Sequence, residues 1–286
     1  SLSGNTRGAI WMTLGATFLV LLAITIRSLQ DDYNVLQMIF MRSIISLMIV
    51  LPWALKQQRN NIRTKRLGLH WFRNIIHYVG NIGWFIAVTL LPLADLSAIQ
   101  FTVPLFTICL AAIFLPEKIV KHRWIATIIG FVGALVIIRP GLIVLSFGTV
   151  AIILSSICYA SSQVATKSLS KTDNPNTILL YMSIMFVLLS FVPACWVWKT
   201  PILLDILPIF SLGVLGYLAH ACIIQSFSAA DASFVMPFDF LRLPISAAFG
   251  IFLYDETLDP WVWIGAMIIF SATYYNTRIE HITERS

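Results

Sequence analysis

Four side chains that can bind a polar solute recur at helical spacing within residues 71–91. Arg73, His77, Asn81 and Trp84 are separated by four, four and three residues, which places them on one face of a helix. The surrounding stretch is apolar enough for a bilayer, where ionisable and amide groups are costly and mark functional sites. This face therefore predicts hydrogen bonding to a polar or anionic solute. The alternative is that Arg73 extends to the membrane surface and the other side chains bridge helices.

A second candidate site lies between two prolines, Pro237 and Pro244. The segment holds Asp239, the only acid in the middle of an apolar run, and Arg242 one turn later. Prolines leave backbone carbonyls unpaired, so we expect a local break in this helix with the charged pair beside it. The alternative is a closed Asp239–Arg242 ion pair that only neutralises both charges.

The remaining polar candidates are scattered singly over other apolar runs. Arg42 is the only charge in its run. We expect it to act in gating or coupling near a water-filled vestibule, or to pair with another helix, rather than to contact the solute. Asp239 is a second candidate for gating or coupling, because a proton or a solute could open its ion pair. Further candidates for solute contact are Gln100, Tyr159, Gln163, Tyr217, His220 and Phe238. For each of them a hydrogen bond between helices, or packing, is the more common role.

Composition indicates what kind of structure must position these residues. Of 286 residues, 58% are hydrophobic and 11% are charged, with a mean hydropathy of +0.86, which lies beyond the range of water-soluble domains. Because a membrane-spanning helix needs roughly 20 apolar residues, we predict an all-α membrane protein with ten transmembrane helices and short loops. The apolar runs are 8–26, 35–55, 71–91, 96–115, 124–138, 147–165, 177–197, 207–229, 232–254 and 261–275.

Lysine and arginine concentrate in alternate loops, as expected when basic loops stay in the cytoplasm. If both termini are cytoplasmic, the opposite side holds only Arg27, Arg139 and Lys199 of the 19 basic residues, and Arg42, Arg73 and Arg242 fall within apolar runs. The net charge of +6 then follows from topology, and we expect no nucleic-acid partner.

Motifs for metal, redox or nucleotide chemistry are missing from the sequence. Its four cysteines fall in four different apolar runs without CxxC spacing, and its five histidines form no HxxxH or HExxH pattern. There is no GxxxxGK[ST] loop for ATP. We therefore expect no cofactor, no metal and no hydrolysis of ATP.

An internal repeat divides the chain into two five-helix halves, 1–140 and 141–286. The matches run at a constant offset of 139 residues: Glu117 with Glu256, Trp124 with Trp263, Ile125 with Ile264, Ile129 with Ile268 and Phe131 with Phe270. Because five is odd, the second half must enter the membrane upside down, which puts Glu117 inside and Glu256 outside.

Three segments of the first half carry a resemblance to a known family: IQFTVPLF at 99–106, FLPE at 114–117 and RWIA at 123–126. The second half repeats them more loosely in MPF at 236–238 and DE at 255–256. On these residues the chain resembles the EamA family of the drug/metabolite transporter superfamily over nearly its whole length. The first-half motif is most similar to S-adenosylmethionine uptake proteins, whereas other members export amino acids or import riboflavin.

The resemblance implies a transporter in a bacterial-type inner membrane, with a central cavity lined mainly by the first, third, fourth, sixth, eighth and ninth helices. We expect a secondary transporter that works by alternating access and needs no obligate protein partner; coupling to protons or another ion stays open. Three intramembrane arginines against one acid favour an amino acid or another carboxylate-bearing zwitterion such as S-adenosylmethionine. The alternatives are riboflavin or another metabolite and, in other classes, an intramembrane enzyme or a channel, for which no catalytic spacing or filter sequence is visible.

Overall fold

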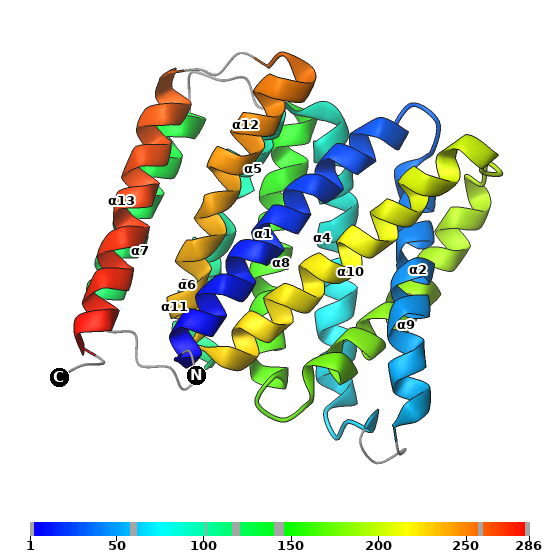
Figure 1. The fold of residues 1–286 in the computed structure, drawn as a ribbon, viewed down its shortest axis with the longest axis horizontal. Coiled ribbons are helices and arrows are strands. Elements are labelled where there is room, and N and C mark those ends of the chain that lie inside the picture. The colour runs from blue at the N-terminus through cyan, green and yellow to red at the C-terminus, as the bar shows by residue number, and fades with distance from the viewer. Residues whose placement is uncertain are drawn as a thin grey trace.

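The structure, a computed structural model, describes residues 3–57, 62–100, 102–115, 121–139, 146–256 and 260–283. Every regular element within these ranges is a helix, and most of the helices run between the same two edges of the molecule (Figure 1). Five are long and apolar enough to cross a membrane, judged by length and composition: α1 (Gly4–Leu29), α2 (Val35–Lys56), α8 (Phe147–Leu169), α9 (Pro175–Trp196) and the η1–α10 segment (Leu203–Ala229). The prediction of an all-helical membrane protein is confirmed for these ranges.

The other helices are shorter or carry more polar residues. The 24-residue α4 (Leu67–Leu90) buries the polar stripe predicted from the sequence. The remaining elements are α5 (Leu93–Gln100), α6 (Thr102–Phe114), α7 (Lys121–Ile138), η1 (Leu203–Asp205), α10 (Ile206–Ala229), α11 (Ala232–Val235), η2 (Met236–Leu241), α12 (Arg242–Tyr254) and α13 (Pro260–Thr283).

Polar caps fix where the long helices begin. The hydroxyl of Ser3 accepts the N–H of the third residue after it, and Ser146 does the same for α8. The amide oxygens of Asn34 and Asn174 each accept the N–H two residues later, at the starts of α2 and α9. Such caps satisfy N–H groups that a helix leaves unpaired at its first turn.

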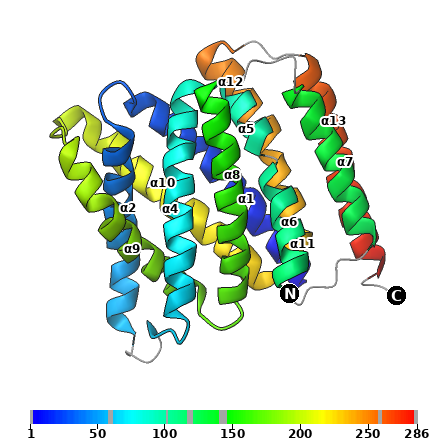
Figure 2. The same cartoon turned by 180° about the vertical axis from the view of Figure 1, so that it is seen from behind.

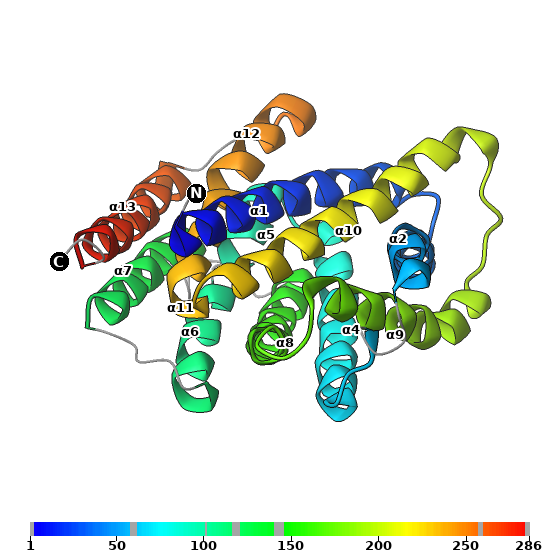
Figure 3. The ribbon, with the colours of Figure 1, turned by 60° about the horizontal axis from the view of Figure 1, so that its bottom comes forward.

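The most extensive helix contacts join one half of the chain to the other: α1 with α10, α4 with α8, α2 with α9 and α7 with α13. The pair α7 and α13 lies at one end of the molecule, and α2 and α9 lie at the other (Figures 2 and 3). Small residues bring these helices close. A Cβ at Gly15 of α1 would lie 3.3 Å from the Ala219 carbonyl of α10, and a Cβ at Gly80 of α4 would lie 3.3 Å from the Ser155 carbonyl of α8.

The outward faces of the bundle are apolar, as contact with lipid requires. On α13, Met267, Phe270 and Tyr274 lie at helical spacing with 63%, 55% and 59% of their surface exposed. On α9, Leu188, Phe191 and Val192 are likewise exposed. Large apolar surfaces of this kind are rare on soluble monomers.

One of the predicted helices is interrupted. The run 232–254 contains the 3₁₀ segment η2 between α11 and α12, which confirms the break expected between its two prolines. Within the run 96–115, expected as one helix, the structure describes α5 up to Gln100 and α6 from Thr102, and Phe101 between them lies outside the described residues.

The two edges of the bundle can be told apart by the chain ends. Both termini lie at one edge, here called the terminal edge, where α1 begins and α8 and α10 end; the far edge holds the ends of α1 and α12 and the start of α5 (Figures 1 and 2). Since α1 begins at the terminal edge and α8 begins at the far edge, the two helices run in opposite directions.

Candidate functional site

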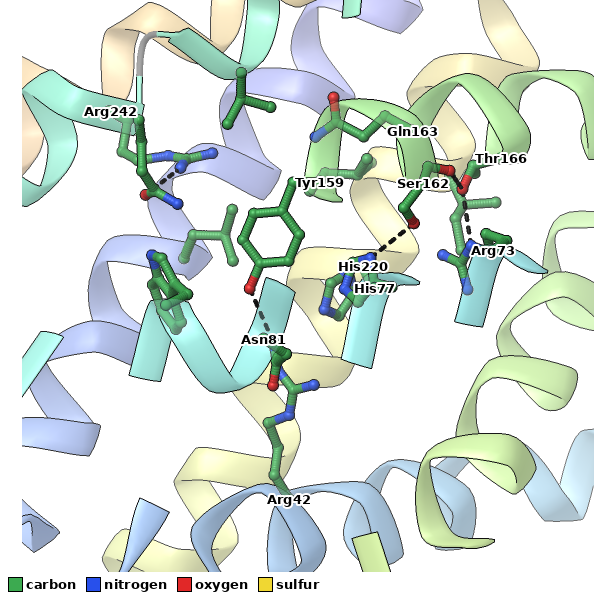
Figure 4. Close-up of a pocket in the computed structure, with 16 residues that line it drawn as sticks. Arg42, Arg73, His77, Asn81, Tyr159, Ser162, Gln163, Thr166, His220 and Arg242 are labelled. Atoms are coloured by element: carbon green, nitrogen blue, oxygen red, sulfur yellow. Dashed lines mark hydrogen bonds between the residues drawn. The ribbon is translucent and has the colours of Figure 1, made fainter. Parts of the chain in front are cut away.

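A cavity lies among the central helices, with about 590 Å³ of space unfilled by protein atoms, its open side included. Its described lining residues come from α1, α2, α4, α5, α6, α8, α10 and α12, and none of them belongs to α7 or α13. Figure 4 shows its polar side chains converging from opposite sides. Ten of the thirteen sequence candidates line it: Arg42, Arg73, His77, Asn81, Trp84, Gln100, Tyr159, Gln163, His220 and Arg242.

Arg73 is buried against α8 and is bonded only to neutral groups in the described residues. Its Nε donates to the Thr166 hydroxyl at 2.9 Å, and Nη1 donates to the Asn74 side-chain oxygen at 2.7 Å. Only 2% of the residue is exposed, so it does not extend to the membrane surface. The guanidinium keeps its positive charge uncompensated at the cavity wall.

His77 and Asn81 join the stripe of α4 to α8. His77 Nδ1 lies 2.9 Å from the Ser162 hydroxyl, and the Asn81 amide donates to the Tyr159 hydroxyl at 3.0 Å. The His77 ring also lies 5.0 Å from that of Tyr159 and 4.9 Å from that of His220 on α10. His77 and Asn81 therefore bridge helices, as the alternative interpretation of this stripe expects, and they also line the cavity. Solute binding by the stripe stays a prediction.

Arg242 sits where the interrupted helix meets the end of α5. It donates to Asp239 Oδ1 at 2.5 Å and to Gln100 Oε1 at 2.7 Å. Asp239 is 2% exposed and Arg242 6%. The carboxylate is therefore held in a closed, buried ion pair, and Arg242 links the start of α12 to the end of α5.

Three sequence candidates do not line this cavity. Tyr217 lines a second, smaller cavity between α2, α9 and α10, which it shares with Arg42 and His220. Phe238 packs its ring against Phe234 at 5.6 Å. Asp239 is not among the described lining residues but accepts a hydrogen bond from Arg242, which is.

The sequence also pointed to Ser162 beside Tyr159 and Gln163, and it left five lining residues out: Leu19, Val103, Thr166, Ile223 and Ile224. The Thr166 hydroxyl could have been found, because Thr166 follows Ser162 by four residues on one face of α8. The apolar residues carry no signal that separates a cavity wall from ordinary core.

Several buried polar atoms around the cavity have no hydrogen-bond partner within the described part of the chain. They are Arg42 Nη1, His77 Nε2, Asn81 Oδ1, Trp84 Nε1, His220 Nε2 and Arg242 Nε. Leaving such atoms unpaired costs about 1–3 kcal/mol each, so their concentration in one place favours a site completed by a bound polar solute. Among the described residues, no group of three or more His, Cys, Asp or Glu side chains could hold a metal ion.

Comparison with known proteins agrees with this geometry. The EamA-like transporter family matches the chain twice, at residues 6–139 and 146–278. The S-adenosylmethionine uptake transporter of Rickettsia bellii (strain RML369-C) is 30% identical over 236 residues, covering 82% of this chain and 81% of that protein. The riboflavin transporter of Brucella anthropi is 31% identical over 255 residues, covering 86% and 89%. A solved crystal structure at 14% identity matches with a TM-score of 0.75, covering 99% of this chain and all of the other, and shows the shared fold.

Proposed function

Because this chain belongs to the EamA-like transporter family, and is a multi-pass membrane protein, we propose that it is a secondary transporter for a small carboxylate-bearing metabolite. The observation that carries the proposal is the buried cavity, where three arginines and several unpaired polar atoms face a space between the two halves of the chain. Uphill transport would draw on a proton or another ion gradient, because the sequence has no ATP-binding loop.

Alternating access by two inverted five-helix halves, 1–140 and 141–286 with ten spans in all, is part of this proposal. It is supported by helices that recur at an offset of 139 or 140 residues, such as α2 with α9 and α4 with α10. Cavity residues recur at the same offsets: Leu19 and Tyr159, Asn81 and His220, Trp84 and Ile223, Val103 and Arg242. A binding site at the interface of inverted repeats is the usual arrangement in secondary transporters.

A matching pair of contacts at the two edges also supports this mechanism. At the far edge, Arg27 donates to the carbonyl of Val88, at 3.3 Å, and to the carbonyl of Leu91. These bonds tie the end of α1 to the end of α4.

At the terminal edge, Lys167 makes the corresponding contacts. It lies 140 residues after Arg27 and donates to the carbonyls of Phe227 and Ala230 at 2.8 and 2.7 Å. These two carbonyls belong to residues that lie 139 after Val88 and Leu91. Each half thus has one cation that ties its first long helix to another helix of the cavity. Arg27 ties α1 to α4 at the far edge, and Lys167 ties α8 to α10 at the terminal edge. Glu117, the sequence counterpart of Glu256, lies outside the described residues.

The terminal edge is the cytoplasmic side in this proposal. Both chain ends lie there (Figure 1), and the loops assigned to that side carry most of the basic residues. The bacterial inner membrane follows from the bacterial sources of the relatives, such as Rickettsia bellii and Brucella anthropi.

The solute class follows from charge and from the relatives. Three arginines line the cavity, none of its described lining residues is an acid, and the neighbouring Asp239 is engaged with Arg242. Arginine binds carboxylates through paired, charge-assisted hydrogen bonds. We propose an amino acid or an amino-acid-bearing solute such as S-adenosylmethionine first, and riboflavin as the runner-up because a riboflavin transporter is similarly related.

A thermal-shift screen of the detergent-purified protein tests the proposed function. Amino acids or S-adenosylmethionine should raise the Tm, because a ligand at about 100 times its Kd stabilises the folded state by roughly 2.7 kcal/mol. Arg73→Ala should remove that shift. The matched control is Arg66→Ala, which removes an arginine bonded to Ser168 outside the cavity and should keep it. A shift from riboflavin alone, kept in Arg73→Ala, would contradict the proposed solute class and site.

A further inference from the structure

Arg42 differs from the other two arginines of the cavity in having no polar partner. Arg73 and Arg242 each donate two hydrogen bonds to neighbouring side chains. Arg42 makes no hydrogen bond or ion pair with any described residue, and its Nη1 is buried and unpaired. Only 2% of the residue is exposed. Its guanidinium is the one in this cavity that lacks a partner in the described part of the chain.

The surroundings of Arg42 hold its side chain in place without neutralising it. The guanidinium carbon lies 5.7 Å from the Phe85 ring centroid and 5.8 Å from that of Phe186. The stem of the side chain crosses α10 at Gly216, where a Cβ would come within 2.7 Å of Arg42 Cδ. Aromatic faces and a glycine contact therefore direct the charge from α2 into the cavity (Figure 4).

Arg42 also stands where the two cavities meet. It lines both the central cavity and the smaller one between α2, α9 and α10, and His220 is the one other residue that the two share in the described part of the chain. His220 Nε2 is likewise buried without a partner. The Arg42 guanidinium, which is a cation, and the His220 Nε2 atom thus border the same space, and both are unpaired within the described residues.

A buried cation without a partner is expensive inside a membrane protein, where such groups normally pair with one another or with backbone carbonyls. Two aromatic rings offset only part of that cost. A bound anion would remove it and would gain charge-assisted hydrogen bonds. This arrangement fits a group that is completed by its ligand rather than by the fold.

We propose that Arg42 binds the carboxylate of the transported solute, with His220 beside it. This assignment rests on the proposed transport function and replaces the gating or coupling role expected from sequence. Of the other two arginines of the cavity, Arg242 is already paired with Asp239. Arg73 already donates two hydrogen bonds to neighbouring side chains. The carboxylate therefore goes to the α2 side of the cavity, and the rest of the solute extends towards Tyr159 and Trp84.

The first arm of the test needs no ligand. Arg42→Met should raise the Tm of the unliganded protein by about 2–4 °C, because a flexible apolar side chain keeps the contact with the rings and removes the unpaired charge. The matched control, Arg242→Met, should lower the Tm, because it leaves Asp239 unpaired in a buried site. A fall in Tm for Arg42→Met, or its failure to fold, would overturn the proposal by showing that the fold itself needs this cation.

The second arm compares S-adenosylmethionine with its decarboxylated form, which differs only in lacking the carboxylate. In the wild type, calorimetry should give an affinity about 10- to 100-fold higher for the carboxylate form. Arg42→Met should bind the two equally, and Arg42→Lys should keep part of the difference. Equal binding of both forms by the wild type overturns the Arg42 assignment. Saturable uptake of a solute without a carboxylate, unchanged in Arg42→Met, also overturns it while leaving the transport function standing.

Discussion

Asp239→Asn is expected to lower the free energy of unfolding by about 3–5 kcal/mol and to abolish transport. The substitution leaves the buried Arg242 guanidinium without its only acidic contact in the described residues. A thermal melt of the detergent-purified variant measures the first effect, and uptake by proteoliposomes measures the second.

The double variant Asp239→Asn/Arg242→Met separates a structural from a functional role of this pair. Replacing both partners removes the uncompensated charge, so most of the lost Tm should return. Transport should stay absent, because Arg242 joins Gln100 to the 3₁₀ segment at the cavity wall. If the double variant transported normally, the pair would serve only for mutual neutralisation and would not belong to the site.

Glu256→Gln is expected to open the far edge of the protein and to slow transport. The Glu256 carboxylate accepts Arg27 Nη1 at 2.7 Å and the backbone N–H of Leu93 at 3.2 Å, so it joins the ends of α1 and α12 to the start of α5. Charge-assisted bonds are worth about 1.5–3 kcal/mol, and their loss would shift the balance of closed and open states roughly 10- to 100-fold. If the equilibrium lies too far towards the state with an open far edge, the protein returns more slowly to the state that opens at the terminal edge, and transport slows.

Labelling of a cysteine introduced at Leu93, in a background without the native cysteines, measures this opening. A membrane-impermeant maleimide should react faster in Glu256→Gln than in the parent. The matched control is Asp32→Asn at the same edge, since the Asp32–Lys199 pair is 3.1 Å long but more than half exposed on both sides and should contribute little. Equal labelling rates in Glu256→Gln and Asp32→Asn would show that the Arg27–Glu256 contact does not close the far edge.

The sequence predicted the site best where helical periodicity or backbone chemistry decided the outcome. Arg73, His77 and Asn81 line the cavity together because residues three or four apart share a helix face. The 3₁₀ segment before Arg242 follows from prolines that cannot donate a backbone hydrogen bond.

Partners across helices could not be read from one sequence. Tyr217 and His220 are three residues apart on α10, yet only His220 lines the central cavity, because their orientations depend on how α10 packs on α2. The absence of a partner for Arg42 within the described residues is likewise a property of tertiary packing. Leu19 and Ile223 also line the cavity. The sequence could not predict this, because an apolar residue at a cavity wall cannot be told from one in an ordinary core.

Counterflow in proteoliposomes is the most direct test of the central claim, that this protein is a carrier with a site exposed alternately to the two sides. Vesicles loaded with unlabelled S-adenosylmethionine, diluted into a trace of the labelled compound, should accumulate label transiently above equilibrium, with saturation at high concentration. Arg73→Ala vesicles should not. Label that enters only down its gradient without saturation would contradict the account, because a channel equilibrates a solute and cannot drive counterflow.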